Sequence, residues 1–101
     1  MGTAENKLQR QIMKWADLNN IWLWRYNNLR VPGRKFIGLL GVPDMIGMIK
    51  PYGRFIGIEV KSKDGKQSRM QIKFMEKCRK YGGLYILARS LDDVIEGLKG
   101  G

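Results

Sequence analysis

The stretch DMIGMIKPYGRFIGIEVK, residues 44–61, decides the fold because it predicts a β-hairpin. Two largely apolar runs, residues 45–50 and 54–61, flank the turn sequence Pro51-Tyr52-Gly53. A tight turn at Tyr52-Gly53 pairs Met45 with Val60, and the alternating apolar residues then lie on one face of the hairpin. The residues on that face are Met45, Gly47, Ile49, Ile56, Ile58 and Val60.

The other face of this hairpin gathers charge at one end. The same register sets Asp44 opposite Lys61 and Ile46 opposite Glu59, so two carboxylates and one ammonium group lie within diagonal reach of one another. Such a group is either a surface salt-bridge cluster, which is nearly neutral in energy, or a functional site.

The sequence on either side of the hairpin supplies helices and two more strands. Capping signals at Thr3, and at Ser68 with Gln71, predict the starts of two helices. The predicted elements are, in order, a helix (4–19), a strand covered on both faces (21–26), a loop (27–43), the hairpin, a helix from Ser68 to Gly82-Gly83, a strand (84–88) and a short helix opened by Ser90. The order αβββαβα indicates one α/β domain over residues 1–101, with a mixed central sheet flanked by helices.

Composition limits the possible chemistry. The chain has 101 residues with 19 Lys and Arg, 9 Asp and Glu and no His, which gives a formal net charge of +10. Without His, Ser–His triads and His-based metal sites are excluded, and the single Cys78 excludes an intrachain disulfide. A polar N-terminus and short apolar runs predict neither a signal peptide nor a membrane span, so we expect a cytoplasmic or otherwise intracellular protein that is not secreted.

The positive charge concentrates in two glycine-containing stretches, residues 30–35 and 61–69. Lys and Arg release counterions when they contact a phosphate backbone, so this composition favours a nucleic-acid partner over a basic surface that is only solvated. The candidate phosphate contacts are Arg30, Arg34, Lys35, Lys63, Lys66 and Arg69.

A further carboxylate, Glu5, falls on the inward face of the first helix with Leu8 and Ile12. By itself it is explained by the favourable placement of an acid in the first helical turn. Together with Asp44 and Glu59 it offers three oxygen-donor side chains for one hard cation such as Mg²⁺, with water and substrate phosphate completing the coordination.

Several of these residues resemble a known signature. The ordered set Gly41-Val42-Pro43-Asp44, Ile58-Glu59-Val60-Lys61 and Gln71, with Glu5 on the first helix, resembles that of the PD-(D/E)XK nucleases. More narrowly, it resembles the VRR-NUC (virus-type replication-repair nuclease) group over almost the whole chain. The resemblance implies a restriction-endonuclease-like αβββαβ core and a Mg²⁺-dependent DNA endonuclease in which Mn²⁺ substitutes. Stand-alone viral members of this kind resemble Holliday junction resolvases that act as homodimers.

The resemblance also implies a role for each residue of the motif. Asp44 and Glu59 are expected to hold the metal together with the Val60 carbonyl, and Glu5 to ligate it directly or through water. Lys61 is expected to orient the attacking water or help to deprotonate it.

Other candidates keep two interpretations. Gln71 either serves only as the helix cap or also positions the water or Lys61. Cys78 is expected to be a small buried hydrophobe rather than a nucleophile. Trp22 and Trp24 are expected to be core or interface residues rather than base-stacking platforms.

We therefore expect a structure-selective DNA endonuclease that resolves four-way junctions as a homodimer, with the apolar residues 21–26 and 36–40 partly covered by the second copy. The alternative within the enzymes is a nuclease for flaps, splayed arms or single strands. The alternative of another class is a non-catalytic nucleic-acid-binding module, and the intact Asp44, Glu59 and Lys61 argue against it. No small-molecule cofactor and no membrane partner are expected.

Overall fold

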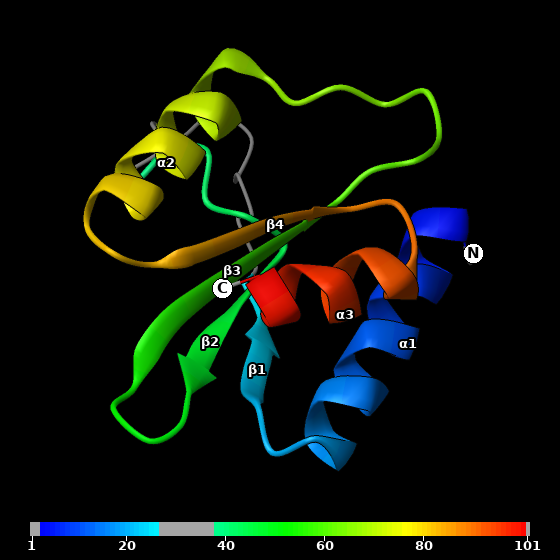
Figure 1. The fold of residues 1–101 in the computed structure, drawn as a ribbon. Helices are drawn as coiled ribbons and strands as arrows, with labels where there is room; N and C mark the ends of the chain where they lie inside the picture. Colours follow the sequence, from blue (N-terminus) through cyan, green and yellow to red (C-terminus); the bar gives the residue numbers. More distant parts are fainter. Residues whose placement is uncertain (1–2, 27–37, 101) are drawn as a thin grey trace.

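The computed structural model describes residues 3–26 and 38–100, so the candidates Arg30, Arg34 and Lys35 lie outside the described residues. The predicted order αβββαβα is confirmed (Figure 1). The elements are α1 (Ala4–Leu18), β1 (Trp22–Arg25), β2 (Met45–Ile49), β3 (Arg54–Val60), α2 (Arg69–Lys80), β4 (Leu84–Ala88) and α3 (Leu91–Gly100).

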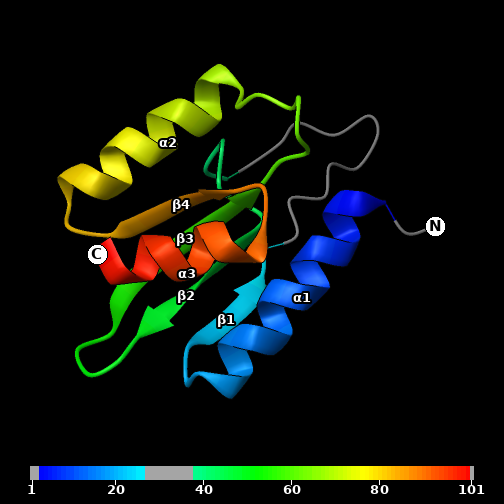
Figure 2. The same cartoon turned by 45° about the vertical axis from the view of Figure 1, so that its right-hand side comes forward.

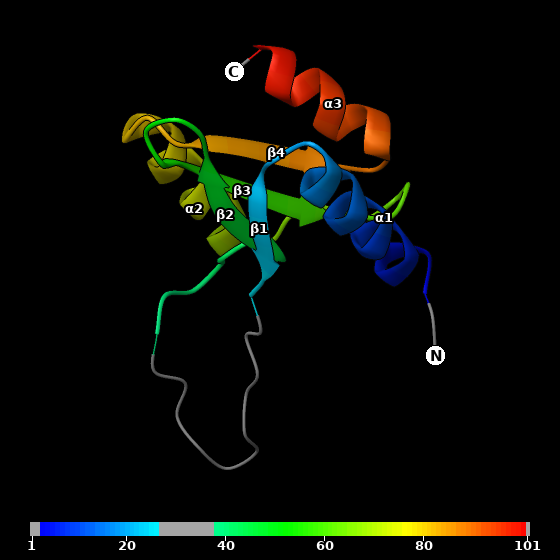
Figure 3. The same ribbon diagram turned by 90° about the horizontal axis from the view of Figure 1, so that it is seen from below.

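The four strands form one mixed sheet, as expected, and their order in it is β1-β2-β3-β4. The first three strands are antiparallel neighbours, whereas β4 runs parallel to β3 after the crossover through α2. The helices cover both faces: α1 and α3 pack on one face, and α2 lies on the other (Figures 2 and 3). The motif residues at the start of β2 and the end of β3 therefore sit between two helical layers.

The hydrophobic core lies under α1 and α3. Every second residue of β3 contributes to it, because alternate side chains of a strand point to the same face. Ile12 of α1 and Val94 of α3 close this core from above, with exposed fractions of 0% and 1%. The opposite face carries Phe55 and Tyr85, whose rings pack on Phe74 of α2.

The predicted register of the hairpin is wrong by two residues. Met45 pairs with Ile58 and Ile49 with Arg54, so the connection is a four-residue loop over 50–53 rather than a two-residue turn. The Gly53 amide donates to the Ile49 carbonyl at 3.0 Å, and Gly53 adopts a φ of 72°, which closes this wider loop. Because the shift is even, every side chain keeps its predicted face.

The expectation that strand β1 is covered on both faces is also wrong. In the described chain β1 is at the edge of the sheet, with α1 packed on one face only. Leu23 is 8% exposed on that face, whereas Trp22 is 65% and Trp24 is 37% exposed on the other. The two tryptophans are therefore not core residues.

Both predicted capping motifs are present. The Thr3 hydroxyl accepts from the Asn6 amide at 3.0 Å, and Ser68 and Gln71 exchange side-chain bonds with each other's backbone amides. No helix in the described residues is long and apolar enough to cross a membrane.

Candidate active site

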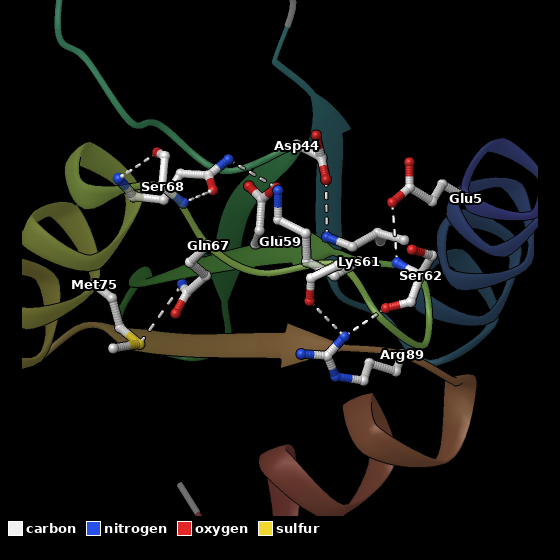
Figure 4. Close-up of polar contacts among 12 residues, drawn as sticks. Glu5, Asp44, Glu59, Lys61, Ser62, Gln67, Ser68, Met75 and Arg89 are labelled. Atoms are coloured by element: carbon white, nitrogen blue, oxygen red, sulfur yellow. Dashed lines mark hydrogen bonds and ion pairs between the residues drawn. The ribbon is translucent and has the colours of Figure 1, made fainter.

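Two carboxylates meet where β2 begins and β3 ends. Continuing the observed register by one step places Asp44 opposite Glu59, rather than opposite Lys61 as predicted. The Asp44 Oδ2 atom accepts a hydrogen bond from the Val60 amide at 2.8 Å. Lys61 is the next residue on the Glu59 face, and its Nζ lies 3.5 Å from Glu59 Oε2 (Figure 4).

The segment before Asp44 is fixed by two close contacts. Gly41 has a φ of 78°, and a Cβ there would lie 2.2 Å from the Met70 carbonyl oxygen in the first turn of α2. Pro43 is fully buried, and a Cβ on Gly57 of β3 would lie 2.8 Å from its ring. The residues before Asp44 therefore fill the space between α2 and the sheet. Packing alone explains why the motif has glycine at position 41 and proline at position 43.

Glu59 is buried and only partly satisfied. Its side chain is 3% exposed, and its Oε2 atom accepts from Gln71 Nε2 at 3.0 Å. The other oxygen, Oε1, is buried without a hydrogen-bond partner among the described residues. A buried carboxylate oxygen left in this way is costly, so it marks a place where a ligand would be stabilised.

The electrostatics of the pair point the same way. Burial, and secondarily the Asp44 carboxylate, raise the pKa of Glu59 to about 7, and Lys61 only partly offsets this effect. The Lys61 ammonium thus does not fully compensate the two facing carboxylates. An all-oxygen donor set with an unpaired buried oxygen fits a hard divalent cation such as Mg²⁺ or Mn²⁺.

Glu5 does not complete a three-carboxylate group. Its Oε2 atom accepts from the Ser62 amide at 3.0 Å, beyond Lys61 on the far side of the pair (Figure 4). In residues 3–26 and 38–100, no three His, Cys, Asp or Glu side chains gather closely enough to hold a metal together. The expected convergence is therefore absent, because the first turn of α1 is occupied by the loop after β3.

Gln71 caps α2 as predicted, and its side chain also contacts Glu59, which differs from the predicted positioning of the water or Lys61. Its side-chain oxygen accepts from the Ser68 amide at 2.8 Å, while its Nε2 atom donates to Glu59. The capping box thus fixes the amide that holds Glu59.

Sequence reasoning missed the nearby Gln67, whose side-chain amide donates to the Tyr85 hydroxyl at 3.1 Å, because no motif indicates that contact.

Arg89 was also missed. Its guanidinium donates to the carbonyls of Ser62, Lys63 and Gly65, and so ties the loop after Lys61 to the end of β4 (Figure 4). The Ser62 backbone is then held from both sides, by Glu5 through its amide and by Arg89 through its carbonyl. This contact joins residues distant in sequence, and only the observed β3–β4 pairing could have indicated it.

The basic candidates of this loop, Lys63, Lys66 and Arg69, are exposed, as phosphate contacts need to be. Cys78 is partly buried on α2, and burial raises its pKa, which argues against a thiolate nucleophile. A cavity of about 560 Å³ lies along α2 beside Leu39 and Leu40, and it does not include the carboxylates.

Comparison with known proteins identifies the family. The family model described as the VRR-NUC domain matches residues 34–92, which are more than half of the chain and include the whole hairpin with Asp44, Glu59 and Lys61. None of the curated proteins matches. A solved structure described as a VRR-NUC domain is 22% identical, with a TM-score of 0.69 over 97% of both chains. A second, described as a VRR-NUC domain protein, is 20% identical, with a TM-score of 0.68 over 99% of this chain and 88% of the other. The chain therefore belongs to the VRR-NUC family of nuclease domains and shares the fold of the solved VRR-NUC structures.

Proposed function

We propose that this protein is a metal-dependent DNA endonuclease that hydrolyses phosphodiester bonds at the Asp44–Glu59 pair. The observation that carries the proposal is the Glu59 Oε1 atom, which is buried beside a second carboxylate and has no partner among the described residues. A divalent cation would satisfy that oxygen and would offset both the burial of its charge and the repulsion by Asp44, which together raise the pKa of Glu59.

The side chains around the pair divide the remaining work. Asp44 and Glu59 would hold the cation, with the Val60 carbonyl as a further oxygen donor, whereas Glu5 is engaged by the Ser62 amide. Bound there, the cation supplies Lewis acidity toward the scissile phosphate. Lys61 is 19% exposed at 3.5 Å from Glu59, so its ammonium reaches solvent and can orient an attacking water or offset negative charge on the phosphate.

The substrate we propose is DNA with a branched structure. The net charge of +10 and the exposed Lys63, Lys66 and Arg69 beside the carboxylates suit a polyanionic backbone. Each chain holds one Asp44–Glu59 pair among its described residues, so paired cuts in a four-way junction require two copies. The exposed Leu39, Leu40 and Tyr81 beside α2 supply apolar surface for a homodimer.

Cleavage assays on a panel of labelled DNAs test this proposal. Junction, flap, duplex and single-stranded substrates are incubated with Mg²⁺, with Mn²⁺ or with EDTA. Asp44→Ala should abolish cleavage and leave DNA affinity equal or higher, because removing an acid reduces repulsion of phosphate. The matched control Asp17→Ala, which changes an exposed carboxylate on α1, should cleave normally.

The outcomes separate the alternatives. Mg²⁺-dependent cleavage that Asp44→Ala retains would overturn the assignment of the site. Binding without cleavage under every metal would favour a nucleic-acid-binding module. A monomer by light scattering, with and without junction DNA, would replace the junction-resolving dimer by a nuclease for flaps or single strands.

A further inference from the structure

Two tryptophans form an exposed aromatic surface on the edge strand. Trp22 and Trp24 alternate along β1, and their ring centroids lie 4.9 Å apart at a tilt of 52°. They are 65% and 37% exposed, whereas the rings of Phe55 and Tyr85 on the same face are covered by α2. Two adjacent exposed tryptophans leave apolar area in contact with water, and covering that area with a binding partner would be favourable.

This aromatic surface shares a sheet face with the proposed active site. Trp24 pairs with Ile46, and Ile46 is two residues along β2 from Asp44, so all three side chains lie on one face. The Tyr26 amide donates to the Asp44 carbonyl at 2.9 Å, which continues the β1–β2 pairing up to the carboxylates. Trp24 is thus two residues, about 7 Å along the strand, from the row that holds Asp44.

The size and charge of the surface indicate its partner. The exposed part of the two side chains amounts to about 250 Å², whereas one side of a standard protein interface needs about 800 Å². Lys50 lies with Trp22 along a cavity of about 300 Å³, so a cation adjoins the aromatic surface. A second copy packed on the same surface would bring its own Lys50 against this one, while a nucleic acid brings both planar bases and negative charge.

We propose that Trp22 and Trp24 stack against unpaired nucleobases of the DNA whose backbone is bound at the Asp44–Glu59 pair. The inference rests on the proposed function for the position of that backbone. Bases within a continuous duplex are covered by their neighbours, whereas bases at a flap or at the centre of a junction can be splayed onto an aromatic side chain. The aromatic surface therefore selects DNA with unpaired bases next to the cut.

Binding measured without metal tests this inference apart from catalysis. Fluorescence anisotropy in EDTA compares a labelled 15-nucleotide oligothymidine with a 15-base-pair duplex. Trp22→Leu and Trp24→Leu keep an apolar side chain and remove the aromatic ring. Each should weaken binding of the single strand about 10-fold or more and that of the duplex less than about 2-fold. Trp24→Phe should keep most of the affinity, and Tyr52→Ala, which removes a 95% exposed ring from the β2–β3 loop, should change neither.

Three results would overturn the inference. Unchanged single-strand affinity in both Leu variants would show that no base stacks there, and an equal loss on duplex and single strand would show a general effect of the substitution. A lower mass of the Leu variants by light scattering would show that the surface joins two copies. If the selective loss is observed but no DNA is cleaved with Mg²⁺, the inference stands and only the proposed catalysis fails.

Discussion

Replacing Glu59 by Gln should make the protein more stable at alkaline pH, in contrast to most changes of a buried residue. The pKa of Glu59 rises from 4.5 to about 7 in the folded protein, chiefly through burial. Between these values the folded state binds more protons than the unfolded state, so the free energy of unfolding falls as the pH rises. At about 1.4 kcal/mol per pKa unit, ionised Glu59 costs the folded state about 3 kcal/mol above pH 7. The amide introduced by Glu59→Gln keeps the shape of the side chain and can accept from Gln71 without carrying the charge.

Urea denaturation followed by circular dichroism in EDTA measures this effect between pH 4 and pH 8. The variant should match the wild type near pH 4 and exceed it by about 3 kcal/mol at pH 8. Glu76→Gln, which changes an exposed carboxylate on α2, is the matched control. Added Mg²⁺ should restore the stability of the wild type at pH 8 and leave the Glu59→Gln protein unchanged. A difference between wild type and variant that is independent of pH would refute the reasoning.

Three further substitutions test how the site is held and whether its basic loop contacts DNA. Gly41→Ala should lose more than about 2 kcal/mol in chemical denaturation, and more than Gly82→Ala, because both have positive φ but only Gly41 lies against backbone; equal losses would contradict the packing argument. Arg89→Ala should speed amide hydrogen exchange over residues 62–65 while leaving the sheet protected, and unchanged exchange would show that the carbonyl contacts do not order the loop. Lys63→Ala should reduce the slope of log affinity against log salt by about one, and an unchanged slope would mean that Lys63 does not reach a phosphate.

The faces of the strands were predictable, but their register was not. Alternation of apolar residues placed Asp44 and Glu59 on one face, and an even error in register left that assignment intact. The register could not be predicted from the loop over 50–53, because a turn sequence with Pro and Gly is compatible with either two or four connecting residues. In the observed pairing the Asp44 and Glu59 carboxylates face each other directly, which supports the proposal that they hold one cation.

Contacts of the helices and loops with the sheet could not be predicted from the sequence. The aromatic run over 21–26 indicated burial, yet α1 covers only one face of β1, so Trp22 and Trp24 are left exposed. Glu5 was expected among the carboxylates, and the loop after β3 engages it instead. In each case the outcome depends on how helices and loops dock on the sheet, and local periodicity carries no information about that docking.

Binding of Mn²⁺ tests the central claim most directly, because it depends on neither DNA nor turnover. Electron paramagnetic resonance of free Mn²⁺, titrated with protein at pH 8, counts the ions that each chain binds. We expect one or two ions per chain for the wild type, a complete loss in Glu59→Gln and Asp44→Ala, and no change in the Asp17→Ala control. Equal Mn²⁺ binding by the wild type and both site variants would contradict the assignment of Asp44 and Glu59 as the metal-binding pair.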